Sequence, residues 1–100
     1  MIEHLDLAVN GATIHVAQCG RGLPLVLLHG WPEFWLTWEP VMAPLAGRFQ
    51  VIAPDLRGFG DSDKPAGPFG PRDQARDVLA MLDALGLGRA GLVGHDIGAR

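Results

Sequence analysis

The fold is decided by residues 90–100, AGLVGHDIGAR, where an apolar run meets an aspartate flanked by glycines. The residues up to Gly94 are predicted to form a short buried strand, and a helix is predicted to begin at Ile97. Asp96 would then lie on the sharp turn between strand and helix, and Gly94 and Gly98 would leave room for that turn. The sequence therefore predicts a strand-turn-helix unit with Asp96 at its tip.

Asp96 in this position has the properties of a nucleophile. The N–H groups at the start of the following helix favour the ionised carboxylate. A carboxylate can displace a leaving group at a tetrahedral carbon without first losing a proton, and the resulting alkyl-enzyme ester needs a base-activated water for its hydrolysis. The N–H of Ile97 would be one donor of an oxyanion hole for that second step. The alternative is a glycine-rich turn in which Asp96 only caps a helix; the elements around it favour the first interpretation.

Working back toward the amino terminus, strands and helices alternate. Asn10-Gly11 separates two strand-like stretches, residues 4–9 and 13–17, as in a two-residue hairpin. Residues 25–28 are continuously apolar and residues 49–53 are apolar apart from Gln50, which is typical of parallel strands buried on both faces. We expect residues 25–28, 50–53 and 91–94 to be mutually parallel, with residues 25–28 central among them.

Two helices are predicted between these strands. In the first, Thr37 would be the N-cap, Pro40 would occupy the first turn and Pro44 would kink or shorten the helix. Its apolar face would contain Trp38, Val41, Met42 and Leu45. In the second, over residues 72–85, the apolar face would contain Ala75, Val78, Leu79, Leu82 and Leu85, while Asp73, Arg76, Asp77 and Asp83 would lie largely elsewhere, and Gly86 would end the helix.

Together these elements predict an α/β fold with a mixed, mostly parallel sheet and helices on both faces.

The chain has 100 residues, 48% hydrophobic side chains and a formal charge of −3. No basic cluster indicates nucleic acid or an anionic membrane as a partner. The amino terminus lacks the pattern of a secretory signal, so a cytoplasmic location is the expectation. Cys19 is the single cysteine and is interpreted as a passive thiol in a strand.

Several motifs resemble epoxide hydrolases of the α/β-hydrolase fold family. These are His29-Gly30-Trp31-Pro32, the run VIAPDLRGFGDSDKP at residues 51–65, and Gly94-His95-Asp96-Ile97-Gly98, in the family's order and spacing. The resemblance is dense over residues 20–100 and looser over the opening hairpin. It implies an α/β-hydrolase fold and an enzyme that opens epoxides to diols through an alkyl-enzyme ester. It also implies that the enzyme uses no cofactor and no metal, and that its partner is a small, apolar epoxide substrate.

The resemblance also assigns roles to particular residues. Asp96 would be the catalytic nucleophile, and the backbone N–H groups of Trp31 and Ile97 would form the oxyanion hole. Trp31 and Trp35 would line the substrate site, although plain core packing is the alternative for both and the preferred interpretation of Trp38. His29, Pro32 and His95 would support the site, and His29 would orient the oxyanion loop rather than act as a base. Asp55, Arg57 and Asp61 would fix their loop.

Other parts of that catalytic machinery have no counterpart in residues 1–100. The base histidine and the charge-relay acid of the family lie downstream of the elbow, and its two ring-opening tyrosines belong to a cap domain; this chain contains no tyrosine. We therefore expect residues 1–100 to be the amino-terminal portion of one α/β-hydrolase core domain. The cap domain and the carboxy-terminal half would lie outside these residues.

Two other functions stay open. Haloalkane and fluoroacetate dehalogenases also attack carbon with an elbow aspartate. Ile97 and Trp31 replace residues typical of the haloalkane enzymes. The fluoroacetate enzymes bind the substrate carboxylate with two arginines; Arg100 matches one of them, and Ile97 replaces the other. An inactive fragment or a non-catalytic member of the fold is the remaining alternative. The substrate's identity and stereochemistry and the oligomeric state are not indicated by these residues.

Overall fold

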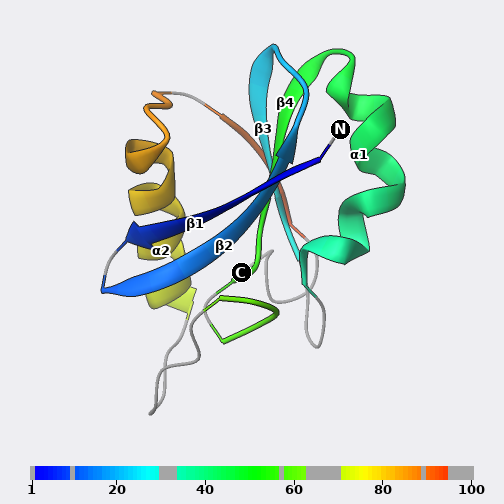
Figure 1. Ribbon diagram of the computed structural model, residues 1–100. Coiled ribbons are helices and arrows are strands. Elements are labelled where there is room, and N and C mark those ends of the chain that lie inside the picture. The colour runs from blue at the N-terminus through cyan, green and yellow to red at the C-terminus, as the bar shows by residue number, and fades with distance from the viewer. Residues whose placement is uncertain are drawn as a thin grey trace.

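The computed structural model describes residues 2–9, 11–29, 34–56, 58–62, 71–88 and 90–94. Their core is a five-stranded sheet with a helical layer on either side (Figure 1). The strands are β1 (Glu3–Val9), β2 (Ala12–Cys19), β3 (Leu23–Leu28), β4 (Phe49–Pro54) and β5 (Gly91–Gly94). The helical segments are the 3-10 helix η1 (Trp35–Trp38) and the α-helices α1 (Glu39–Ala46) and α2 (Pro71–Ala84).

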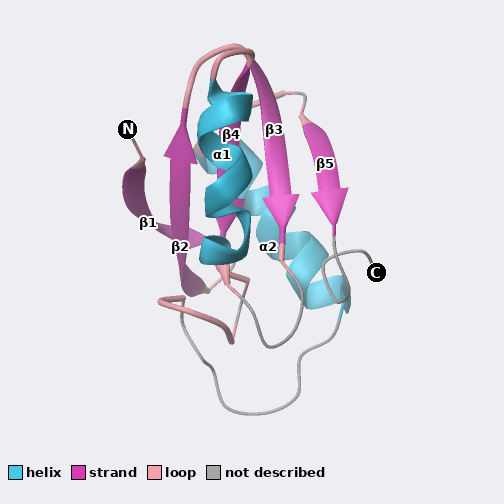
Figure 2. Ribbon diagram, turned by 90° about the vertical axis from the view of Figure 1, so that its right-hand side faces the viewer, coloured by secondary structure: helices cyan, strands magenta, loops and turns pink. Residues whose placement is uncertain are grey.

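The sheet has the strand order β1-β2-β4-β3-β5 and combines two kinds of pairing. β1 and β2 form the expected antiparallel hairpin, with Val9 opposite Ala12, and Gly11 has a φ of +78°. β2 is also antiparallel to β4, whereas β3 is parallel to both β4 and β5 (Figure 2). The prediction of three parallel strands with residues 25–28 in the middle is confirmed.

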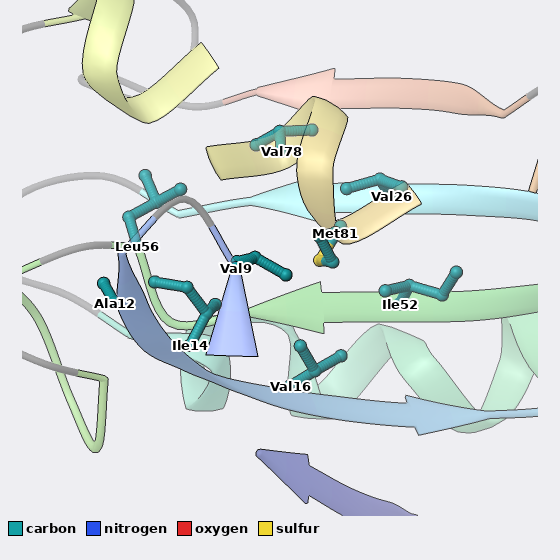
Figure 3. Close-up of a cluster of buried hydrophobic side chains, with 9 residues drawn as sticks. All are labelled: Val9, Ala12, Ile14, Val16, Val26, Ile52, Leu56, Val78 and Met81. Carbon is teal, nitrogen blue, oxygen red and sulfur yellow. The ribbon is translucent and has the colours of Figure 1, made fainter. Parts of the chain in front are cut away.

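Successive side chains of each strand point to opposite sides of the sheet, so both faces carry apolar side chains, and helices cover both. On one face, buried side chains of the strands pack with Leu56 from the loop after β4 and with Val78 and Met81 of α2. Figure 3 shows this cluster of nine residues: Val9, Ala12, Ile14, Val16, Val26, Ile52, Leu56, Val78 and Met81. On the other face, a second buried cluster packs beneath α1 and η1: Ala17, Cys19, Leu27, Met42, Val51 and Ala53. The neighbours Val26 and Leu27 thus belong to different clusters, as expected for a strand buried on both faces.

The first helix begins differently from the sequence-based expectation. The chain enters it through η1, and the N–H of Thr37 bonds to the carbonyl oxygen of Phe34 at 3.0 Å. Thr37 is therefore already inside a helical turn, and its prediction as the N-cap is wrong. Trp38 is the N-cap of α1 and makes no side-chain capping bond. α1 ends two residues after Pro44, and Met42 is fully buried. Val41 is exposed, so its expected place on the buried face is wrong.

The second helix was located correctly, but its buried face is shifted. Its buried side chains are those of Gln74, Asp77, Val78 and Met81, whereas Leu79 is 63% exposed. Ala75 is exposed as well, so the expected positions of Ala75, Leu79 and Asp77 are wrong. The spacing of hydrophobic residues predicts a helix, but it does not decide which side of the helix is buried. The expected face and the observed face both include Val78, Leu82 and Leu85, and packing against the sheet decides between them.

The end of α2 has the predicted glycine. Gly86 adopts a φ of +72°. The N–H of Gly86 donates to the carbonyl oxygen of Asp83 at 3.0 Å, and the N–H of Leu87 donates to the carbonyl oxygen of Leu82 at 2.9 Å. This pair of bonds is the Schellman motif, which satisfies carbonyl groups left over at a helix end. β5 follows at one edge of the described sheet with Leu92 and Val93 exposed. Among the described helices, none has the length and apolar character to cross a membrane.

Candidate active site

The carboxyl ends of β3, β4 and β5 meet at one edge of the sheet because these strands are parallel. Leu28 at the end of β3 lies opposite Gly94 at the end of β5. His29 follows β3 directly, Asp55 follows β4, and the predicted elbow follows β5. Binding sites in open α/β sheets lie outside the carboxyl ends of the strands, so the fold gathers the candidate residues at the expected edge.

Asp55 is the centre of a buried hydrogen-bond network at this edge. Its side chain is inaccessible to solvent. The backbone N–H of Trp35 donates to Oδ1 of Asp55 at 2.7 Å, while Oδ2 accepts from Nδ1 of His15 at 2.8 Å and from the N–H of Asp61 at 2.9 Å. These donors replace the water that a buried carboxylate loses on folding. The prediction that Asp55 fixes its loop is confirmed.

The backbone around Asp55 is joined to β2 by a second set of bonds. The N–H of His15 donates to Oγ of Ser62 at 2.8 Å, and the hydroxyl of Ser62 donates to the carbonyl oxygen of Asp55. The N–H of Asp55 in turn donates to the carbonyl oxygen of His15 at 2.8 Å. The loop after β4 is therefore held against β2 at both ends of its described part.

His15 also contacts His4 on the neighbouring strand. Nε2 of His15 lies 3.0 Å from Nδ1 of His4, and the two rings are inclined by only 13°. Because Nδ1–H of His15 donates to Asp55, a neutral His15 offers Nε2 as an acceptor for His4. His4 makes an edge contact with the Trp35 ring at a centroid distance of 5.1 Å.

His29 occupies a fully buried position at the end of β3. Its Nε2 accepts the backbone N–H of Leu56 at 2.9 Å, and its ring meets Phe59 edge-on at 5.0 Å. An acceptor Nε2 means that a neutral His29 has its proton on Nδ1. This arrangement suits the predicted orienting role, because the Nε2 lone pair is already engaged by the backbone.

Gly60 allows the loop to close around Asp55. Its φ is +51°, and a Cβ built at this position would collide with the Asp55 carboxylate. Both the left-handed backbone and the close approach require glycine. A single residue type thus makes room for the central carboxylate of the network.

The ligating atoms of His15, Asp55 and Asp61 lie within 4.8 Å of one another. Such a group resembles a metal site in composition. However, both nitrogens of His15 and both carboxylate oxygens of Asp55 take part in hydrogen bonds. The arrangement is satisfied as a hydrogen-bond network, and we assign no metal to it.

Five of the predicted site residues lie outside the described residues: Trp31, Pro32, His95, Asp96 and Ile97. Their roles stay predictions, as does that of Arg57 in the loop after β4. Trp35 is described and half-buried, and it packs against the α1-side cluster and His4. These are the contacts of a core residue, so its role toward substrate also stays a prediction. Trp38 packs against the same cluster, as expected.

Sequence reasoning missed the participation of His15 and Ser62. It placed His15 in a strand, but no local pattern separates a buried histidine that binds an aspartate from one that only fills space. The signal is the antiparallel register of β2 and β4, in which Val16 lies opposite Pro54. That register brings His15 next to Asp55, and it becomes visible only when the strand pairing is known.

Comparison with known proteins agrees with this architecture. The family model of the α/β hydrolase fold matches residues 24–100. A soluble epoxide hydrolase of Corynebacterium sp. (strain C12) is 48% identical over 97 residues, covering 97% of this chain and 34% of the relative. Epoxide hydrolase 2 of Siraitia grosvenorii is 43% identical over 101 residues, covering 98% and 32%.

Solved structures give the same result. The solved structure of an epoxide hydrolase without ligand superposes with a TM-score of 0.95 at 48% identity, over 98% of this chain and 35% of that chain. An epoxide hydrolase from Vigna radiata gives a TM-score of 0.94 at 40% identity, over 98% and 33%. The chain belongs to the α/β hydrolase fold family, and its resemblance to epoxide hydrolases is confirmed. It spans about a third of the length of these relatives.

Proposed function

We propose that residues 1–100 contribute the nucleophile and the oxyanion hole of a hydrolase that opens epoxides to diols. The observation that carries the proposal is the parallel register in which Leu28 lies opposite Gly94. It brings the start of the HGWP segment and the start of the GHDIG segment to adjacent strand ends. The epoxide hydrolase names of the relatives support the choice of substrate class.

In the proposed first step, a carboxylate oxygen of Asp96 attacks an epoxide carbon. A new C–O bond forms, the ring C–O bond breaks, and the ring oxygen takes a proton from an acid outside residues 1–100. The product is an alkyl ester of Asp96. A carboxylate suits this displacement because it is already an anion.

In the proposed second step, a base-activated water attacks the ester carbonyl. The N–H groups of Trp31 and Ile97 stabilise the negative oxygen of the tetrahedral intermediate. Its collapse releases the diol and restores the Asp96 carboxylate. The oxyanion hole therefore acts mainly in hydrolysis of the ester.

We also propose that residues 1–100 form the amino-terminal portion of one core domain. The coverage of about a third of each relative supports this division. The base histidine, the charge-relay acid and the cap domain would lie outside these residues. A cytoplasmic location and a small, apolar epoxide as substrate are further predictions from the sequence.

The experiment that tests the nucleophile uses the full-length protein and an aryl epoxide such as styrene oxide. Repeated turnover in heavy-oxygen water is expected to place label in Asp96, because water attacks the ester carbonyl, and peptide mass analysis detects it. Asp96→Asn should abolish turnover, since an amide is uncharged and a poor nucleophile. Label in the diol alone after many cycles would mean that water attacks the epoxide directly.

Fluoroacetate is the discriminating substrate in the same experiment. A dehalogenase would release fluoride from it, and we expect none, because Ile97 replaces one of the two arginines of the fluoroacetate enzymes. Fluoride release without diol formation would favour the dehalogenase. Failure to convert either substrate would favour a non-catalytic member of the fold.

A further inference from the structure

We propose that His15 is a positioning residue, which acts through Asp55 to hold the segment that carries the proposed oxyanion donor. His15 would thereby set the rate at which the alkyl-enzyme is hydrolysed. The inference rests on the proposed function above. It assigns a role in catalysis to a buried side chain of the opening hairpin that lies outside all three sequence motifs.

Two hydrogen bonds anchor the chain on either side of the proposed donor. On the amino-terminal side, Nε2 of His29 accepts the N–H of Leu56 at 2.9 Å. On the carboxy-terminal side, the N–H of Trp35 donates to Oδ1 of Asp55 at 2.7 Å. Both anchors attach to consecutive residues of the loop after β4, so the position of that loop controls where the segment between His29 and Trp35 begins and ends.

His15 fixes the orientation of the Asp55 carboxylate. Its Nδ1–H binds Oδ2 at 2.8 Å, while Oδ1 is left to accept Trp35. A hydrogen bond to an ionised carboxylate is stronger than one between neutral groups. His15 is itself held by the Ser62 hydroxyl and by its backbone pairing with Asp55. Loss of the imidazole would leave Oδ2 with the N–H of Asp61 but without its side-chain donor, so the carboxylate would be held less firmly and the Trp35 anchor would loosen.

The position of the oxyanion donor matters most when negative charge develops on the ester oxygen. That charge arises in the hydrolysis of the alkyl-enzyme and not in the attack on the epoxide carbon. A loosened anchor should consequently slow hydrolysis more than alkylation. The predicted signature is accumulation of alkyl-enzyme, with kcat and KM falling together because a slower second step lowers both.

The test compares His15→Asn, His15→Gln and His15→Leu in the full-length protein by rapid quenching with styrene oxide and mass analysis of the intact protein. An asparagine amide can donate from close to the position of Nδ1, whereas a glutamine amide reaches toward Nε2. We expect His15→Leu and His15→Gln to slow ester hydrolysis by about 10- to 100-fold, the range associated with a misplaced catalytic group. His15→Asn should restore most of the rate.

Val16→Ala is the matched control. Val16 is the next residue on β2 and is fully buried, but it belongs to the cluster on the opposite face of the sheet. It should lower the thermal stability without causing alkyl-enzyme to accumulate. This control separates a general loss of packing from a specific loss of positioning.

The possible outcomes distinguish the two proposals. Equal hydrolysis rates in His15→Gln and His15→Asn, or equal accumulation in Val16→Ala, would overturn the role of His15 while leaving the nucleophile assignment intact. Should His15→Leu fail to fold, the asparagine and glutamine variants decide the question. A wild-type protein that never forms an ester at Asp96 would instead refute the proposed function, and this inference with it.

Discussion

Gly60 and Gly86 have similar backbones but different surroundings. Their φ values are +51° and +72°, in the region that side chains other than glycine rarely adopt. A Cβ at Gly60 would meet the buried Asp55 carboxylate, whereas a Cβ at Gly86 would meet nothing within 4 Å. The pair therefore separates the cost of a left-handed backbone from the cost of a collision inside the network.

We predict that Gly60→Ala lowers the free energy of unfolding by about 2 to 5 kcal/mol, the sum of backbone strain and overpacking. Gly86→Ala should cost only about 1 to 2 kcal/mol, from strain alone. Urea unfolding of the full-length protein measures both values. Equal losses would mean that the Asp55 carboxylate moves aside without cost, and that the loop after β4 does not depend on a fixed network.

At the scale of the element, α2 presents a different stripe to the sheet from the one its hydrophobic pattern suggested. Met81 is 1% exposed and joins the α2-side core cluster, while Leu79 is 63% exposed. Gln74 and Asp77 occupy buried positions that apolar residues would otherwise fill. The face that α2 buries is thus decided by its neighbours in the tertiary structure.

The two faces predict different costs for the same kind of truncation. Met81→Ala should lower the free energy of unfolding by about 2 to 5 kcal/mol, because it leaves a cavity in the core. Leu79→Ala should change it by no more than about 0.5 kcal/mol, as is usual for surface positions. Thermal or urea unfolding of the full-length protein gives both numbers. A comparable loss for Leu79→Ala would show that another part of the full-length protein covers this face.

The elements differ in how much of them local sequence determines. Asn10-Gly11 and the apolar runs at residues 25–28 and 51–53 are local signals, and they predicted the hairpin and the parallel strands correctly. Thr37 was misassigned because a capping side chain is only one way to begin a helix, and the chain enters α1 through η1 instead. The bond between His15 and Asp55 spans 40 residues. Pairing of β2 with β4, which are far apart in the sequence, brings the two residues together, so the local motifs could not predict this bond.

At the scale of the whole molecule, the described residues leave two apolar surfaces exposed. β5 lies at one edge of the described sheet and pairs with β3 on one side, and its side chains Leu92 and Val93 are 60% and 40% exposed. Leu79 adds an apolar side chain on the outer face of α2. Exposed strand edges and apolar patches promote association between chains.

We therefore predict that the 100-residue chain, expressed by itself, associates or packs loosely and shows no epoxide hydrolysis. Size-exclusion chromatography and binding of a hydrophobic dye measure the first property, and diol formation measures the second. Chemistry should fail independently of packing, because no tyrosine within residues 1–100 can protonate the opening epoxide. With no base to activate water, any ester formed at Asp96 would also persist. Steady turnover above an Asp96→Asn control would contradict the proposal that residues outside this chain complete the site.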